Sequence, residues 1–248
     1  MYSKNILLTN DDGIDGEGLL ELEKKLSEVC NVYVLAPSSN RSAVSSQLTM
    51  HYPLKIEKRG DNRFACFGSP VDCVITALRS DLFGVRFDAV FSGINKGANL
   101  GTDIIYSGTA AAARQAVLYK IPGIAVSLES FDGIWKYSAL ADFCAKNLEK
   151  LISLCTDELF VSLNACSSDK YKEAVISPLC IRDYRDMVSI IKAPDDKLYS
   201  FFKGGNIQSK GVDGCDAYIS ESGRIAISRI YAEPVCAAYD TEPLSFQF

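Results

Sequence analysis

The sequence predicts an α/β protein with a Rossmann-like, doubly wound, mostly parallel sheet and a β-rich C-terminal extension. Short apolar runs alternate with helix-length amphipathic segments up to about residue 165, as in a sheet whose strands are joined by helices. After Pro178 the apolar spacing becomes that of short strands. The 248 residues, 48% of them hydrophobic, suffice for a sizeable core. We therefore expect a core over residues 1–177 and a β-hairpin and oligomerisation arm over residues 178–248.

The first elements form a βαβ unit. An apolar run at 5–9 predicts a strand that ends in the turn Asn-Asp-Asp-Gly at 10–13. Apolar residues at helical spacing follow over 19–29, and a second strand at 32–36 is closed by Pro37. A strand, a helix and a strand within about 30 residues predict two parallel strands.

The later elements alternate in the same way until the last quarter. Pro70 in a first turn is typical of a helix start, and the Ser-rich segment 38–49 is longer than a usual connection, as functional loops often are. The apolar content of the last quarter favours a second copy of the chain as partner. The expected elements are a hairpin at 54–56 and 64–67, a helix at 70–82, a strand at 88–91, a loop at 92–107, a helix at 109–119, a strand at 124–128, and late strands at 187–192, 198–203 and 224–230.

Charge and composition exclude several classes of protein. The net charge of -5 argues against a nucleic-acid polymer as partner, because phosphate backbones need a surplus of Lys and Arg. No apolar stretch resembles a secretory signal or a membrane span, so we expect a cytoplasmic protein. Nine scattered cysteines without a Cys-x-x-Cys pair predict neither a disulfide framework nor a zinc site. The single histidine, His51, excludes a His-rich metal site or a two-histidine phosphatase.

Two polar clusters follow the first two predicted strands. Asp11 and Asp12 are adjacent carboxylates at a strand end, where mutual repulsion is commonly offset by a cation. A capped turn without a ligand remains the alternative, because Asn and Asp favour turns. In the Ser-rich loop after the second strand, Ser42 can supply a neutral oxygen ligand and Arg41 a charge near an anion, although such a loop is often only a connection.

A third cluster is rich in glycine and asparagine. The segment 92–99 contains Asn95 and precedes Ser107-Gly108-Thr109, which opens a helix. Free N–H groups at a helix start favour a bound anion, although Ser or Thr can equally be a plain helix cap. The P-loop pattern and the Gly-x-Gly-x-x-Gly fingerprint are both missing, which counts against NAD.

Together these motifs resemble the SurE family of 5'/3'-nucleotidases, also called survival protein E. The similarity lies in Leu8 to Gly13, Ala36-Pro37 with Arg41 to Ala43, and Gly68 to Val74, and it extends over Ser92 to Gly101 with Tyr106 to Thr109. It covers about the first 130 residues. After the Ser-Gly-Thr motif, Arg114-Gln115-Ala116 stands where the family usually has an acidic residue and a glycine. The C-terminal third matches only weakly, at Asp216 and at Gly223 to Ser228.

The resemblance implies a phosphatase that hydrolyses nucleoside monophosphates with one divalent ion, Mg²⁺ or Mn²⁺, per subunit. It places the metal on Asp11, Asp12, Ser42 and Asn95, with Asp11, Asp12 and Asn95 catalytic. The substrate phosphate is expected at Asn10, Asn95, Ser107, Gly108 and Thr109. It also implies a homodimer or homotetramer.

Other functions can be weighed against this one. A phosphatase with an aspartyl nucleophile needs Asp-x-Asp after the first strand, and Asp11-Asp12 has the wrong spacing. A non-catalytic sensor of nucleotide or metal on the same fold remains the alternative from another class. His51 is a weak candidate to protonate the leaving oxygen, and its alternative role is that of a strand residue beside the pocket.

Overall fold

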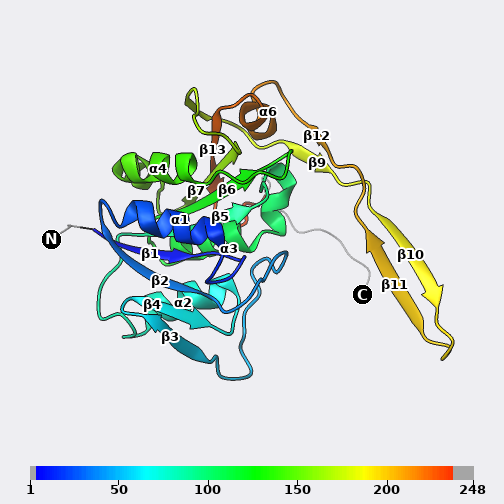
Figure 1. Ribbon diagram of the computed structural model, residues 1–248, viewed down its shortest axis with the longest axis horizontal. Helices are drawn as coiled ribbons and strands as arrows, with labels where there is room; N and C mark the ends of the chain where they lie inside the picture. Colours follow the sequence, from blue (N-terminus) through cyan, green and yellow to red (C-terminus); the bar gives the residue numbers. More distant parts are fainter. Residues whose placement is uncertain (1–3, 237–248) are drawn as a thin grey trace, which may run out of the picture.

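The computed structural model describes residues 4–236 and has a nine-stranded sheet at its centre (Figure 1). All neighbouring strands are parallel except two pairs, one of which is the edge hairpin and the other β7 with β13. The expected mostly parallel sheet is thereby confirmed. In sheet order the strands are β3 (Ile56–Gly60), β4 (Arg63–Cys66), β2 (Asn31–Pro37), β1 (Asn5–Thr9), β5 (Ala89–Lys96), β6 (Gly123–Glu129), β7 (Leu159–Cys166), β13 (Ile225–Tyr231) and β8 (Ala174–Ile176).

Helices cover both faces of this sheet because successive strand residues point to opposite faces. Ile6 and Leu8 of β1 pack in one core cluster with α1, α4 and α5, whereas Leu7 packs in another with α2 and α3. The sheet is therefore doubly wound. The helices are α1 (Glu17–Leu26), α2 (Pro70–Arg79), α3 (Gly108–Leu118), α4 (Ser138–Lys146), α5 (Leu148–Leu154) and α6 (Asp216–Glu221), with a 3₁₀ turn η1 (Gly101–Ile105).

Two helix starts show the expected local chemistry. Ser69 accepts a hydrogen bond from the Asp72 backbone N–H (3.1 Å), and the Asp72 carboxylate accepts one from the Ser69 N–H (2.9 Å). Pro70 occupies the first turn of α2, where no hydrogen bond of its nitrogen is lost. Ser107 caps α3 in the same way by accepting from Ala110 (3.0 Å). These caps fix where both helices begin.

Strand β5 is longer than expected. The segment 92–96 was predicted as the start of a loop, but it continues the strand as far as Lys96. Asn95 and Lys96 pair with Ser127 and Leu128 of β6 after a register shift. Their polar composition resembles a loop, yet pairing on the β6 side keeps the backbone extended.

The last quarter divides differently from the prediction. Residues after 178 were expected to extend away from the core, but β13 pairs antiparallel with β7 inside the central sheet. Ile225 and Ile227 are buried there, at 0% and 6% exposure. The projecting part is therefore an insertion between β8 and α6. The predicted arm also included residues 237–248, which lie outside the described residues.

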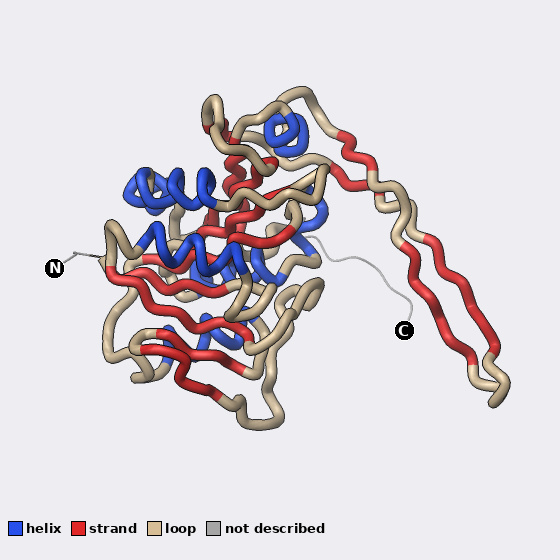
Figure 2. The backbone as a smooth tube through the Cα atoms, viewed as in Figure 1, coloured by secondary structure: helices blue, strands red, loops and turns tan. Residues whose placement is uncertain are grey.

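We call residues 181–210 the arm. It leaves the body as two paired ribbons and extends well beyond the sheet (Figures 1 and 2). Its two strand pairs are both antiparallel, and every residue of the outer pair is exposed. The inner ribbon consists of β9 (Ile181–Asp183) and β12 (Gln208–Lys210), and the outer ribbon of β10 (Met187–Lys192) and β11 (Leu198–Lys203).

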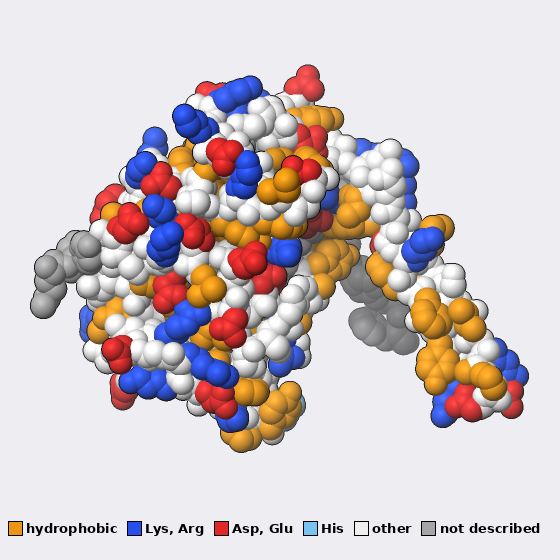
Figure 3. Space-filling model, in the orientation of Figure 1, with side chains coloured by type: hydrophobic (Ala, Val, Ile, Leu, Met, Phe, Trp, Pro, Cys, Tyr) orange, Lys and Arg blue, Asp and Glu red, His pale blue; other side chains and the backbone are white. Residues whose placement is uncertain are grey.

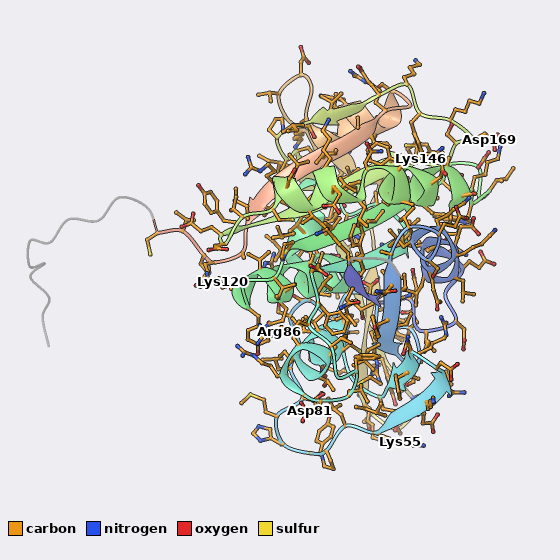
Figure 4. The ribbon with its side chains drawn as sticks, turned by 90° about the vertical axis from the view of Figure 1, so that its left-hand side faces the viewer. Lys55, Asp81, Arg86, Lys120, Lys146 and Asp169 are labelled. Atoms are coloured by element: carbon orange, nitrogen blue, oxygen red, sulfur yellow. The ribbon has the colours of Figure 1, made fainter. Side chains whose placement is uncertain are left out.

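The body and the arm differ in surface chemistry. On the visible face of the body, acidic and basic side chains are interspersed, whereas hydrophobic side chains gather along the arm (Figure 3). Exposed charged residues such as Lys55, Arg86 and Lys146 point outward from the body (Figure 4). None of the helices within residues 4–236 has the length and apolar content that a membrane crossing needs.

Candidate active site

The candidate site lies where the strand order reverses. Strands β1 and β5 are neighbours in the sheet. The chain adds β2 and β4 on the side of β1, and later β6 and β7 on the side of β5. In open α/β sheets ligands bind beyond the carboxyl ends of the strands at such a point. Asp11 and Asp12 follow β1, and Asn95 lies near the end of β5. The Lys96 N–H donates to the Asp12 carboxylate at 2.9 Å, which ties the two strand ends together.

Asp11 is a buried carboxylate held at the start of α3. Its side chain accepts hydrogen bonds from the Thr109 hydroxyl (2.6 Å) and the Thr109 N–H (3.2 Å). Burial nevertheless raises the pKa of Asp11 to about 6, and the neighbouring Asp12 adds to the rise. The local hydrogen bonds therefore do not fully offset the loss of water around this charge.

Asp12 is half-buried on the other side of the same turn. Burial raises its pKa as well, against the lowering effect of the Lys96 N–H and side chain. Asp12 lines a second, acidic pocket of about 310 Å³ with Asp15 and Glu17. Two adjacent carboxylates whose charged forms are both disfavoured make a position that a cation would stabilise.

The loop carrying Ser42 is fastened to both flanks of the site. The Arg41 N–H donates to the Asp11 carbonyl (2.6 Å), and the Ser42 N–H donates to the Asn40 side chain (2.9 Å). Farther along, the Ser45 hydroxyl donates to the Ile105 carbonyl (2.7 Å). These bonds hold Ser42, an exposed serine, opposite Asp11.

A cavity of about 260 Å³ joins most of the predicted residues. Asn95 presents its carbonyl oxygen for a ligand, because its amide nitrogen donates to the Gly97 carbonyl (2.9 Å). We call this space the polar cavity. Among the predicted site residues it is lined by Asp11, Ser42, Asn95 and Ser107, and further by Ala43, Lys96, Gly97, Ala98, Asn99, Asp103, Tyr106 and Tyr184.

Asn10 does not have the expected position. Its side chain is fully buried, donating to the Gly13 carbonyl (2.8 Å) and accepting from the Gly13 N–H (3.2 Å). Both polar groups thus hold the turn that presents Asp11 and Asp12. The predicted contact of Asn10 with phosphate is replaced by this structural role.

Gly108 and Thr109 support the cavity and do not line it. A Cβ atom on Gly108 would lie 3.0 Å from the Asp11 Cβ and 3.1 Å from an Asp11 carboxylate oxygen. Thr109 directs its hydroxyl and N–H to the same carboxylate. Of the Ser-Gly-Thr motif, only Ser107 reaches the cavity that was expected to hold phosphate.

Four charged or aromatic residues of the lining were not predicted from the sequence as site residues. Lys96 and Tyr106 lie within the polar motifs, next to Asn95 and Ser107, so the sequence could have indicated that they line the site. Asp103 and Tyr184 were not recognisable, because Tyr184 is brought from the arm by a hydrogen bond of its hydroxyl to Asp103 (2.7 Å). His51 is exposed and does not line the polar cavity.

The oxygen donors around the polar cavity fit a hard divalent cation. They comprise the carboxylate of Asp11, the hydroxyl of Ser42 and the amide oxygen of Asn95, which are ligand types of Mg²⁺ and Mn²⁺. The predicted fourth ligand, Asp12, does not line this cavity but the neighbouring acidic pocket. A second group, Cys180, Cys215 and Asp216, is also close enough to be considered. There, however, Asp216 accepts from three backbone N–H groups, those of Cys180, Gly101 and Ala217, so it fixes the base of the arm to the core.

The chain is similar to several known proteins over most of its length. A family model described as survival protein SurE matches residues 6–186. A 5'-nucleotidase SurE from Treponema pallidum is 43% identical over 184 residues, covering 72% of this chain and 98% of its own. Another from Citrifermentans bemidjiense is 37% identical over 232 residues, covering 92% and 93%. The crystal structure of the SurE protein from Aquifex aeolicus has a TM-score of 0.78 at 27% identity, covering 93% and 94%. The chain belongs to the SurE family.

Proposed function

We propose that this protein is a metal-dependent phosphatase that releases phosphate from nucleoside monophosphates, as a 5'/3'-nucleotidase. The observation that supports it most is the pair of adjacent carboxylates, disfavoured in their charged forms, beside neutral oxygen donors at the switch point of the sheet. The relatives named 5'-nucleotidase SurE favour the same substrate class.

In this proposal Asp11, Asp12, Ser42 and Asn95 hold one Mg²⁺ or Mn²⁺ ion per subunit. Bound there, the ion would neutralise phosphate charge and favour attack of water on phosphorus. Ser107 can donate its hydroxyl to a phosphate oxygen, and the positive end of α3 lies behind it. Lys96 lines the same cavity and adds positive charge beside the phosphate. Much of the rate then comes from positioning.

Assembly and location are part of the same proposal. The exposed apolar residues of the arm favour a homodimer or homotetramer in which the arm supplies much of the contact. A cytoplasmic location agrees with nine cysteines that are all free in the described structure.

Removal of metal tests the proposal directly. After exhaustive EDTA dialysis, hydrolysis of AMP should stop while the circular dichroism spectrum stays native, because the core clusters do not include the site residues. Added Mn²⁺ should restore turnover. Full activity in metal-free buffer would refute a metal enzyme. Tight binding of AMP without phosphate release at any metal concentration would instead identify a sensor.

Gly108→Ala should lower turnover of AMP about tenfold with little loss of fold, because the added methyl group displaces Asp11 by a few tenths of an ångström. The control is Gly60→Ala in the edge hairpin, where an added Cβ meets the Arg63 Cβ at a similar distance of 3.3 Å but no residue of the site. Steady-state kinetics with far-UV circular dichroism would measure both effects. Equal activity of the two variants would show that Gly108 does not position Asp11.

A further inference from the structure

A second, apolar cavity continues from the polar one. Its volume is about 430 Å³, and we call it the aromatic cavity. Three of its residues, Ala43, Tyr106 and Tyr184, also line the polar cavity, so the two spaces meet at a common wall. Its remaining lining residues are Asp186, Phe202, Gly204 and Ile207, which all belong to the arm.

The aromatic rings in this wall are held in place. Tyr106 and Tyr184 meet edge to face, with ring centroids 5.9 Å apart and planes at 78°. The Tyr184 hydroxyl donates to Asp103 (2.7 Å), which also forms an ion pair with Arg182 (3.3 Å). Tyr106 and Phe202 nevertheless leave 55% and 69% of their surfaces exposed. The Tyr106 ring, held by Tyr184, and the exposed Phe202 ring therefore provide surfaces for stacking.

We propose that the aromatic cavity binds the base of the nucleotide whose phosphate lies in the polar cavity. The inference rests on the proposed function, because it assumes a phosphate beside Asp11 and Ser107. A nucleoside monophosphate is polar at one end and flat and aromatic at the other, and the joined cavities have the same order of chemistry. Tyr106 directly precedes Ser107, so the chain itself connects the two ends. Stacking on aromatic side chains is how proteins commonly hold unpaired bases.

Asp186 gives this cavity a preference among bases. Asp186 is the charged residue in the lining of the aromatic cavity. A carboxylate accepts hydrogen bonds and donates none. Guanine offers two adjacent donors, its ring N–H and its 2-amino group, whereas hypoxanthine offers only the ring N–H. GMP should therefore be a better substrate than IMP, and Asp186→Asn should bring the two to within about twofold of each other.

The matched pair Phe202→Ala and Phe201→Ala tests the stacking. The two residues are neighbours in β11, so they point to opposite faces of the ribbon, and only Phe202 lines the cavity. Turnover is compared as the ratio of kcat/KM for GMP to that for ribose 5-phosphate, which has no base. The ratio should fall about tenfold in Phe202→Ala, a typical loss for one stacked base. It should not change in Phe201→Ala.

Binding of free guanosine separates this inference from the proposed function, because it needs neither phosphate nor metal. Calorimetry should show weaker binding to Phe202→Ala than to the wild type and to Phe201→Ala, with light scattering confirming equal assembly. If the wild type does not hydrolyse AMP but Phe202→Ala still weakens guanosine binding, the phosphatase proposal would be refuted while the base-binding inference would stand. The base-binding inference would be overturned if Phe202→Ala left both the guanosine affinity and the substrate ratio unchanged. It would also be overturned if Phe201→Ala lowered them as much as Phe202→Ala.

Discussion

Asp11→Asn should abolish hydrolysis of AMP and at the same time make the metal-free protein more stable. The folded state raises the pKa of Asp11 from 3.8 to about 6, mainly through burial. A difference of about two pKa units corresponds to about 3 kcal/mol. Asparagine removes the buried charge but loses the favourable contact with the Thr109 N–H, so we expect a gain of about 2 kcal/mol.

The stability gain of the metal-free Asp11→Asn variant should depend on pH. Below about pH 4 the carboxyl is protonated in both folded and unfolded chains, so burial of the charge costs nothing. Between about pH 4 and pH 6 the unfolded chain ionises first, and the stability of the metal-free wild type should fall as pH rises. Above about pH 6 the full penalty is present. The advantage of Asp11→Asn should therefore grow from pH 4 to 6 and then stay constant.

Urea unfolding in EDTA at several pH values, together with turnover in Mn²⁺, would measure both effects. Asp12→Asn is the matched comparison, because Asp12 is less buried; it should also lose activity but gain less stability. Turnover of Asp11→Asn within about threefold of the wild type would contradict a ligand role, since a lost ligand should cost several kcal/mol of transition-state stabilisation. A destabilised metal-free variant would instead indicate that Asp11 is needed for the fold.

The metal-site candidates could be found from the sequence because strand ends are local features. Asp11 follows an apolar run directly, and parallel strands place the segments that follow them at one edge of the sheet. Asp11, Ser42 and Asn95 accordingly line one cavity. The expected position of Asn10 was wrong, because a turn residue can direct its side chain to the local backbone as readily as to a ligand.

Residues that depend on long-range packing were beyond the reach of the sequence. Tyr184 lines the polar cavity, where its hydroxyl donates a hydrogen bond to Asp103, a residue 81 positions earlier in the chain. The position of β13 in the central sheet also depends on long-range packing, because Ile225 and Ile227 become buried when β13 pairs with β7. Its alternating pattern predicted a strand but could not show which sheet it would join.

No segment within residues 4–236 covers the apolar side chains of the outer ribbon of the arm. Because adjacent residues point to opposite faces, β10 and β11 present one face with Val188, Ile190 and Phe202 and another with Met187, Ile191 and Phe201. All six are more than half exposed. A two-stranded ribbon is marginal on its own in water. A second copy of the chain would cover the face with Met187, Ile191 and Phe201 and the part of the other face outside the aromatic cavity, in agreement with the proposed homo-oligomer.

Removing the outer ribbon should convert the oligomer into a monomer. Met187 pairs with Lys203, so the ends of the ribbon are adjacent, and an Asn-Gly turn can replace residues 187–203 without disturbing the inner ribbon. Light scattering at micromolar concentration should give the full chain at least twice its 27.1 kDa and the shortened chain the mass of one subunit. The wild type should also be the harder to unfold at high concentration.

A single substitution tests whether the apolar face of the outer ribbon makes the contact between subunits while the ribbon itself stays intact. Ile190→Asp places a charge on one apolar face while β10 and β11 remain paired, so it should weaken assembly, whereas Lys197→Ala in the exposed tip should not. The observation that counts against the arm is a full chain that scatters light as a single subunit. A shortened chain that stays oligomeric would place the interface on the body of the protein instead, because the central sheet and its helices are unchanged in that variant.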